Sequence, residues 1–143
     1  MMPHGLNAPR IVDVPIIRDK RGAIAVLEPP TLGFPIGRTY FLFDVDEFAE
    51  RGGHAHRSLH QCLIAAAGCF TVQLDDGLDL QKEVELNTPQ QGLILPPGHW
   101  RRIHSFSSRA ICLVLASDVY DESDYIRDHA EFLAWRAEHD SAR

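Results

Sequence analysis

Short β-type runs separated by turn residues recur along most of this 143-residue chain. They cover residues 11–17, 23–28, 38–45, 61–67, 69–74, 78–86, 92–96, 101–106 and 110–116. Runs that recur about every eight to twelve residues are typical of a β sandwich or barrel. The segments 52–53, 75–77 and 96–98 between them contain Gly, Asp and Pro, which favour turns. The sequence therefore predicts an all-β fold.

The pattern changes after residue 116. Apolar and aromatic side chains between residues 125 and 136 recur at the spacing of one helix face. Asp121 or Ser123 can cap the start of this helix. We therefore predict one domain, 1–143, with a β barrel over about 10–116 and a C-terminal helix over about 121–139 that packs on the outside of the barrel.

The charge of the chain limits its partners. Lys and Arg number 14 against 20 Asp and Glu, which gives a formal net charge of −6. Nucleic acids and anionic membranes are bound by basic surfaces, so the composition argues against both as partners. An anionic ligand must be held by a local cluster of arginines.

The three cysteines lie in apolar runs, are odd in number and show no C-x-x-C spacing. These are Cys62, Cys69 and Cys112. Such a pattern indicates buried free thiols in a reducing compartment. The N-terminus lacks a signal-type apolar stretch, and no run approaches the roughly 20 apolar residues of a membrane span. We expect a soluble, cytoplasmic protein.

Two histidines stand one residue apart in the segment RGGHAH. Because residues i and i+2 of a strand share a face, His54 and His56 should project together. With Gln61 and Gly68 they reproduce the spacing of the first cupin motif, and the turn at 96–98 resembles the second. This spacing favours a cupin, the double-stranded β-helix jelly roll.

Two expected cupin metal ligands are replaced. Gln61 stands where a glutamate is usual, and Arg101 stands where the third histidine is expected. An amide is a weaker ligand than a carboxylate, and a guanidinium has no acceptor atom. We therefore predict no metal and no cofactor, with a metal-dependent cupin enzyme that recruits His99 or His104 as the alternative. Two imidazoles beside an arginine can move protons and hold an anion.

Longer segments carry a specific resemblance. They are KRGAIAVLE (20–28), IGRTYFLFDV (36–45), RGGHAH (51–56), DDG (75–77), PPGHW (96–100) and HSFSSRAICLVLASDVYDESDYIRDHAEF (104–132). With Gln61 and Gly68, this ordered set resembles the cupin-type 3,4-ketoisomerases that act on dTDP-4-keto-6-deoxyglucose, a group related to the C-terminal WxcM-like domains. One departure is the sequence Trp-Arg-Arg at 100–102, where many members have Trp-His-Glu.

The resemblance implies a homodimer that moves the sugar ketone from C4 to C3 through an enediol(ate), for deoxysugar and surface-glycan biosynthesis. It implies that His54, His56 and Tyr40 are catalytic. The expected substrate-binding residues are Arg38, Arg51, Gln61, Trp100, Arg101, Arg102 and His104. Short strands with open edges also favour a dimer.

The chemistry of these residues suits the implied substrate. Arginines bind diphosphates through paired hydrogen bonds, which makes Arg51, Arg101 and Arg102 candidates. Trp100 either stacks on the thymine or fills the core, and Gln61 is expected to orient a histidine. A non-catalytic cupin that binds a nucleotide sugar remains an alternative. A related sugar epimerase is another, although the different His–Asp arrangement of those enzymes is not found in the sequence.

Overall fold

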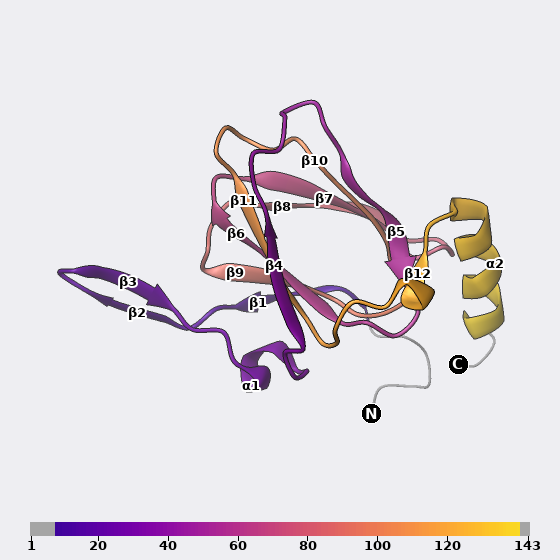
Figure 1. Ribbon diagram of the computed structural model, residues 1–143, viewed down its shortest axis with the longest axis horizontal. Helices are drawn as coiled ribbons and strands as arrows, with labels where there is room; N and C mark the ends of the chain where they lie inside the picture. Colours follow the sequence, from indigo (N-terminus) through magenta and orange to yellow (C-terminus); the bar gives the residue numbers. More distant parts are fainter. Residues whose placement is uncertain (1–7, 141–143) are drawn as a thin grey trace.

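The computed structural model describes residues 8–140 as two five-stranded antiparallel sheets that face each other (Figure 1). The first sheet has the order β1 (Arg10–Asp13), β9 (Gln91–Leu95), β6 (Gln61–Ala67), β11 (Ile111–Ala116) and β4 (Arg38–Leu42). The second has the order β12 (Tyr125–Ile126), β5 (Arg51–His56), β10 (Trp100–His104), β7 (Phe70–Asp75) and β8 (Gln81–Leu86). The predicted all-β jelly roll is confirmed.

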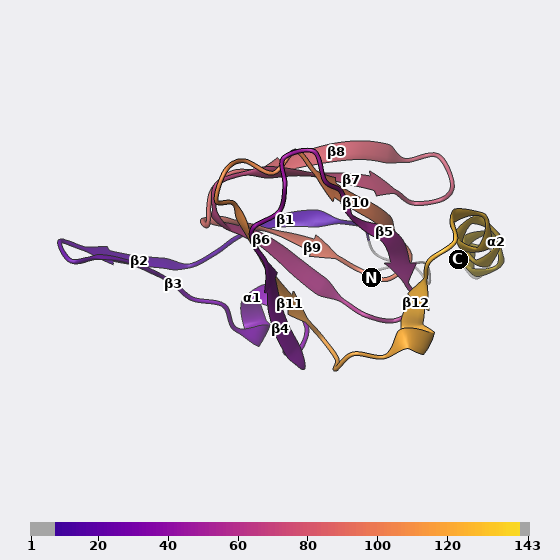
Figure 2. The same ribbon diagram turned by 45° about the horizontal axis from the view of Figure 1, so that its top comes forward.

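The remaining elements lie outside the two sheets. They are the hairpin strands β2 (Ile16–Asp19) and β3 (Gly22–Ala25), the short helix α1 (Pro29–Leu32), the 3-10 turn η1 (Glu122–Asp124) and the helix α2 (His129–Asp140). The β2–β3 hairpin projects away from the barrel on the side opposite α2 (Figures 1 and 2). No helix among residues 8–140 is long and apolar enough to cross a membrane.

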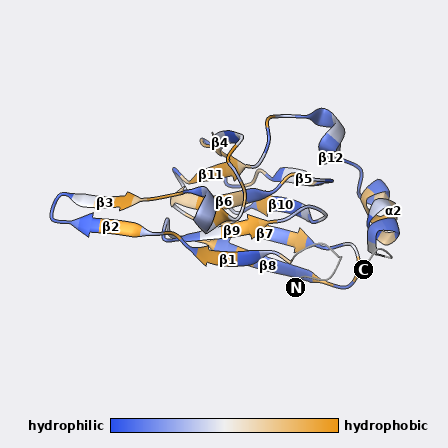
Figure 3. Cartoon of the chain, turned by 90° about the horizontal axis from the view of Figure 1, so that it is seen from below, coloured by the Kyte–Doolittle hydropathy of each residue, from blue (hydrophilic) through white to orange (hydrophobic). Residues whose placement is uncertain are grey.

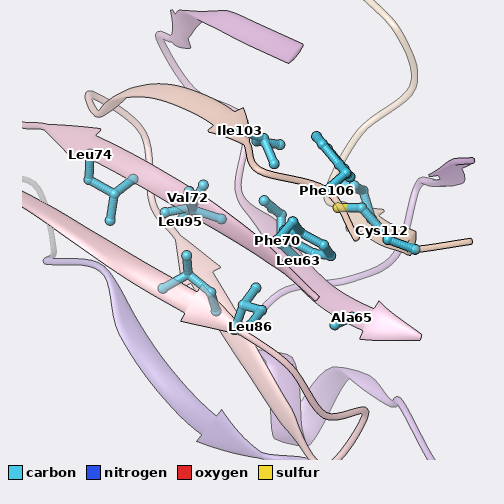
Figure 4. Close-up of a cluster of buried hydrophobic side chains, with 13 residues drawn as sticks. Leu63, Ala65, Phe70, Val72, Leu74, Leu86, Leu95, Ile103, Phe106 and Cys112 are labelled. Atoms are coloured by element: carbon cyan, nitrogen blue, oxygen red, sulfur yellow. The ribbon is translucent and has the colours of Figure 1, made fainter. Parts of the chain in front are cut away.

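The main core lies between the two sheets. Along β7, Phe70, Val72 and Leu74 are buried while the residues between them are more exposed, as the alternation of a strand requires. These side chains meet Leu63 of β6 and Leu86 of β8 (Figure 4). The apolar alternation of the strands therefore fixes which of their residues face inward.

Strand β5 contains the paired glycines that the sequence analysis assigned to a turn. Gly52 and Gly53 have φ angles of 89° and 75°, in the left-handed region that favours glycine. A Cβ at Gly52 would lie 2.9 Å from the carbonyl oxygen of Arg101 on β10. The register between β5 and β10 shifts at this point, so the glycines form a bulge within the strand. The predicted turn is wrong.

The C-terminal helix begins later than predicted. Asp121 caps η1 by accepting from the Ser123 backbone, and residues 125–126 pair with β5 as β12. The helix α2 starts at His129, with the side chain of Asp128 accepting from the Glu131 backbone at 3.0 Å. The predicted start at 121 is therefore wrong, because strand pairing takes this segment. Residues 1–7 and 141–143 of the predicted domain lie outside the described residues.

Helix α2 packs on the outer face of β5. Phe132 is fully buried in a cluster with Ala55 and Ile126, and Trp100 and Trp135 pack against its edge. The helix therefore covers the outside of the strand that carries both histidines, as predicted.

We expect Phe132→Ala to lower the free energy of unfolding by about 3–5 kcal/mol, because the change leaves a cavity beneath α2. Leu133→Ala is the control, since the neighbouring side chain is 40% exposed and should change stability by less than about 1 kcal/mol. Urea unfolding of both variants measures the difference. Equal, small losses would show that α2 is not anchored through Phe132.

Candidate active site

A cavity of about 580 Å³ lies inside the barrel and is lined from both sheets. Six of the predicted site residues line it. They are Arg38 and Tyr40 from β4, Arg51 and His54 from β5, Gln61 from β6, and Arg101 from β10. The fold therefore gathers residues that are up to 63 positions apart, 38 to 101, around one space.

The predicted residues Trp100, Arg102 and His104 lie elsewhere. Alternate residues of β10 face opposite sides of the sheet, so Arg101 and Ile103 point into the barrel and these three point outward. Trp100 and Arg102 line a separate hollow of about 540 Å³ on the outer face. Their predicted contact with a substrate in the barrel cavity finds no support in this placement.

Each of the three outward side chains has a local partner. The Trp100 ring packs edge-on against His129 of α2, with ring centroids 5.0 Å apart. Arg102 pairs with Glu50 at 3.3 Å, and a ring nitrogen of His104 lies 3.5 Å from a carboxylate oxygen of Glu83. These contacts account for the side chains as parts of the outer surface.

The two histidines lie together, as predicted, but they are not equivalent. Their ring centroids are 4.9 Å apart in an edge-to-face arrangement. His54 lines the cavity, whereas His56 has no exposed surface. Burial, with the positive charge of Arg101 next in importance, lowers the pKa of both rings to about 2. Both imidazoles are therefore neutral at neutral pH.

His56 is held by a carboxylate from the C-terminal segment. Its Nδ1 lies 3.0 Å from Oδ2 of Asp124. The other oxygen of Asp124 accepts from the Ser58 backbone and hydroxyl, both at 2.7 Å, and Oδ2 also accepts from the Leu59 backbone at 3.3 Å. The other ring nitrogen of His56, Nε2, is buried with no hydrogen-bond partner among the described residues.

A hydrogen-bonded chain crosses the cavity floor from Arg101 to Tyr40. Arg101 donates from Nη1 to Oε1 of Gln61, and the amide nitrogen of Gln61 donates to the Tyr40 hydroxyl at 3.1 Å. Gln61 thus orients a tyrosine and an arginine, and it makes no hydrogen bond to a histidine among residues 8–140. Burial raises the pKa of Tyr40, so its phenol stays protonated and its O–H remains free to donate into the cavity.

This chain also bears on metal binding. The two replaced ligand positions, Gln61 and Arg101, are bonded to each other. His99 has its Nδ1 3.2 Å from the Pro96 carbonyl oxygen, and His104 faces outward. No group of three or more His, Cys, Asp or Glu side chains in residues 8–140 is arranged to hold a metal ion. The donor set of this cavity therefore does not fit a cupin metal.

The cavity is strongly cationic although the chain is acidic. Four arginines line it against the single carboxylate of Glu50. Arg127 is paired with Glu122 at 2.8 Å, but the other three form no ion pair within the described part of the chain. Arg101 keeps a buried Nη2 with no partner there. Burial lowers the pKa of Arg101 to about 10, which leaves it charged at neutral pH. The arrangement suits an anionic ligand.

Sequence reasoning missed three site residues from the segment after β11. Tyr125 and Arg127 line the cavity, and Asp124 holds His56. The Tyr125 ring lies 5.0 Å from that of His54 and 4.4 Å from that of His56, and the guanidinium of Arg127 lies over it at 4.1 Å. The predicted helix over about 121–139 includes this segment and so conceals its return to β5. Its distinctive sequence, YDESDYIR, was the available signal.

Comparisons with known proteins agree with this geometry. The model of the family described as WxcM-like, C-terminal (FdtA) matches residues 7–137. The TDP-4-oxo-6-deoxy-alpha-D-glucose-3,4-oxoisomerase of Aneurinibacillus thermoaerophilus is 40% identical over 129 residues, which cover 90% of this chain and 92% of that protein.

Solved structures of two ketoisomerases share the fold. One is the 3,4-ketoisomerase QdtA from Thermoanaerobacterium thermosaccharolyticum, in a variant with a histidine replaced by asparagine and in complex with TDP-4-keto-6-deoxyglucose. Its TM-score is 0.88 at 34% sequence identity, and the match covers 91% of this chain and 94% of that one. The other is the WlaRB TDP-quinovose 3,4-ketoisomerase of Campylobacter jejuni, with a TM-score of 0.84, 41% identity, and coverage of 88% and 97%. The chain belongs to the WxcM-like, C-terminal family of cupin-type 3,4-ketoisomerases.

Proposed function

We propose that the chain is a sugar 3,4-ketoisomerase that moves the ketone of TDP-4-keto-6-deoxyglucose from C4 to C3. The predicted activity is confirmed at the level of the reaction by the 40% identical oxoisomerase and by the family. The observation that carries the mechanism is the position of His54, which presents a neutral imidazole to a cationic cavity that also contains Arg101 and the Tyr40 hydroxyl.

His54 is the group that moves the proton. The ring removes the proton from C3 of the sugar, and the electrons of the C–H bond form the C3–C4 double bond of an enediol(ate). A proton is then returned to C4 while the C3 hydroxyl loses its proton and becomes the new ketone. The carbon skeleton is rearranged with no net oxidation, so the reaction as written consumes no external electron acceptor or donor.

Tyr40 and Arg101 stabilise the charge that forms during this step. When the C3 proton leaves, negative charge develops on the C4 oxygen. The Tyr40 hydroxyl already accepts from Gln61 and therefore has its hydrogen available for this oxyanion. Arg101 has one nitrogen, Nη2, without a partner in the described part of the chain, and its burial keeps water from screening its charge. Fixed donors of this kind stabilise an enediolate without reorganising during the reaction.

The diphosphate of the substrate adjusts the base. Burial lowers the pKa of His54, and the nearby positive charge of Arg101 lowers it further. A bound diphosphate offsets part of that positive charge and so raises the pKa of His54. The ring thus becomes a stronger base when the substrate is present. Arg101 is proposed to bind the diphosphate as well, together with Arg38, Arg51 and Arg127, the other cations that line the cavity.

We also propose a homodimer. Ile17 and Ile24 are cross-strand partners in the β2–β3 hairpin and are 59% and 61% exposed. Strand β2 is hydrophobic near the barrel and hydrophilic towards its tip (Figure 3). An isolated hairpin is marginally stable in water, so a surface that covers its apolar half is required. The open edge at β4, with the exposed pair Phe41 and Phe43, is the matching surface on a second copy.

The proposed setting is the cytoplasm, with the chain as one domain. All three cysteines are free, and two of them, Cys62 and Cys112, are buried. Burial raises the pKa of both thiols to about 12, which keeps them protonated and unreactive. A nucleotide sugar is a soluble metabolite, which agrees with this setting.

We expect the wild-type protein in D2O to convert TDP-4-keto-6-deoxyglucose to a 3-keto sugar that carries deuterium at C4, as followed by proton NMR. His54→Asn should lower turnover by at least about 100-fold, because the titrating ring is lost. His104→Asn is the control, since that ring faces outward and its loss should leave turnover unchanged. Tight TDP binding by the wild type without turnover would instead support a non-catalytic binding protein.

Arg101→Ala should weaken binding of TDP or substrate by about 1.5–3 kcal/mol, because a charged hydrogen bond is lost. Arg102→Ala is the matched control on the opposite face of the same strand and should bind normally. Calorimetric titration with TDP measures both. Similar affinities for the two variants would exclude Arg101 from the ligand site.

Turnover should survive treatment with EDTA, because Gln61 and Arg101 are hydrogen-bonded to each other where a metal would need ligands. The measurement compares rates before and after dialysis against the chelator. Loss of activity that a single divalent ion restores would favour the metal-dependent alternative.

The wild type should sediment as a dimer at micromolar concentration. Ile17→Glu should shift it towards the monomer, because it places a charge on the apolar half of the hairpin. Leu133→Glu, on exposed α2, is the control and should leave the dimer intact. A wild type that sediments as a 16.1 kDa species would contradict the proposal.

A further inference from the structure

We propose that Asp124 is a positioning residue that fixes the tautomer of His56, and through it the proton transfer at His54. The inference rests on the proposed ketoisomerase function. Asp124 lies 68 residues after His56 in the sequence and contacts its ring. It does not line the main cavity with His54, so its effect must pass through the His56 ring.

The hydrogen bonds of Asp124 define the direction of the contact. Both of its oxygens accept backbone hydrogens, from Ser58 at 2.7 Å and from Leu59 at 3.3 Å. A carboxylate in this arrangement acts as an acceptor. The neutral His56 ring therefore carries its one proton on Nδ1 and donates it to Asp124. This leaves Nε2 with a free lone pair.

The position of His56 gives this lone pair a role. Nε2 is buried and has no partner among the described residues, and the nearest imidazole is that of His54, with ring centroids 4.9 Å apart. When His54 takes the C3 proton it becomes positively charged. A lone pair on the neighbouring ring stabilises that charge, whereas an N–H at the same place opposes it. The tautomer of His56 thus affects the reaction and not the binding of the diphosphate.

The carboxylate of Asp124 takes part in four hydrogen bonds, and its two oxygens have different partners. Variants can therefore test separately whether Asp124 anchors the segment or controls the tautomer of His56. Its Oδ1 accepts from the Ser58 backbone and hydroxyl, and its Oδ2 faces His56 and the Leu59 backbone. Asp124→Asn keeps the size of the side chain, and its amide oxygen can keep the Ser58 contacts. Its NH2 group then replaces Oδ2, so that Nδ1 of His56 becomes the acceptor and the Leu59 backbone loses its 3.3 Å hydrogen bond. The proton of the ring moves to Nε2.

The experiment measures tautomer, turnover and affinity on the same proteins. In the wild type, nitrogen-15 NMR of the imidazoles should show His56 protonated on Nδ1, and in Asp124→Asn on Nε2. Asp124→Asn should lower kcat by at least about 10-fold while TDP affinity changes less than about 2-fold. Ser58→Ala removes one hydrogen bond to Oδ1 but keeps the contact with His56, so it should keep both the tautomer and kcat.

Asp121→Asn is a second control, since that carboxylate caps η1 through Ser123 and makes no hydrogen bond to a histidine among residues 8–140. It should behave as wild type.

A wild-type His56 protonated on Nε2 would overturn the proposal even if Asp124→Asn failed to fold. If Ser58→Ala lowered kcat as much as Asp124→Asn does, Asp124 would only hold the local structure in place, and the proposal would be wrong. The tautomer is read without substrate, so a wild type that lacks isomerase activity would refute the proposed function alone.

Discussion

The hydrogen bond between Arg101 and Gln61 is the contact on which the inside of this barrel depends. A guanidinium that is 2% exposed is costly unless its hydrogens are bonded. Gln61 and the His99 carbonyl supply acceptors, and neither carries a charge. A carboxylate at position 61 would neutralise the arginine, whereas an amide accepts one of its hydrogen bonds and leaves the cavity positive. Glutamine at position 61 therefore has two effects: it removes a metal ligand, and it leaves the positive charge of Arg101 in the cavity.

The segment from Asp121 to Arg127 connects the site to the rest of the molecule. Its strand β12 pairs with β5, the strand that carries both histidines. From this one short stretch come the carboxylate on His56, the Tyr125 ring against both imidazoles, and the Arg127 guanidinium. The helix that follows buries Phe132 on the outside of the same strand. The C-terminal region thus supports β5 along its edge and on its outer face.

Much of the site was predictable because strand alternation relates sequence to direction. Strand alternation places the two histidines on the same face of β5 and directs Arg101 of β10 into the barrel. The same rule, applied along β10, places Trp100, Arg102 and His104 on the outer face of the sheet, away from the cavity. Gly52 and Gly53 have turn composition, and only the approach of the Arg101 carbonyl shows that they form a bulge within a strand.

The sequence by itself determined the all-β class, the family, and the replacement of two metal ligands, since these depend on residue type and spacing along the chain. Tertiary structure alone decided which histidine meets the cavity, which partner Gln61 takes, and that Asp124 holds His56. The hydrogen bonds of Gln61 to Arg101 and of His56 to Asp124 join residues 40 and 68 positions apart, the first across the two facing sheets and the second from the turn before β12. Local propensity cannot report such contacts, because the free energy that selects them comes from packing and hydrogen bonds formed only when the strands meet.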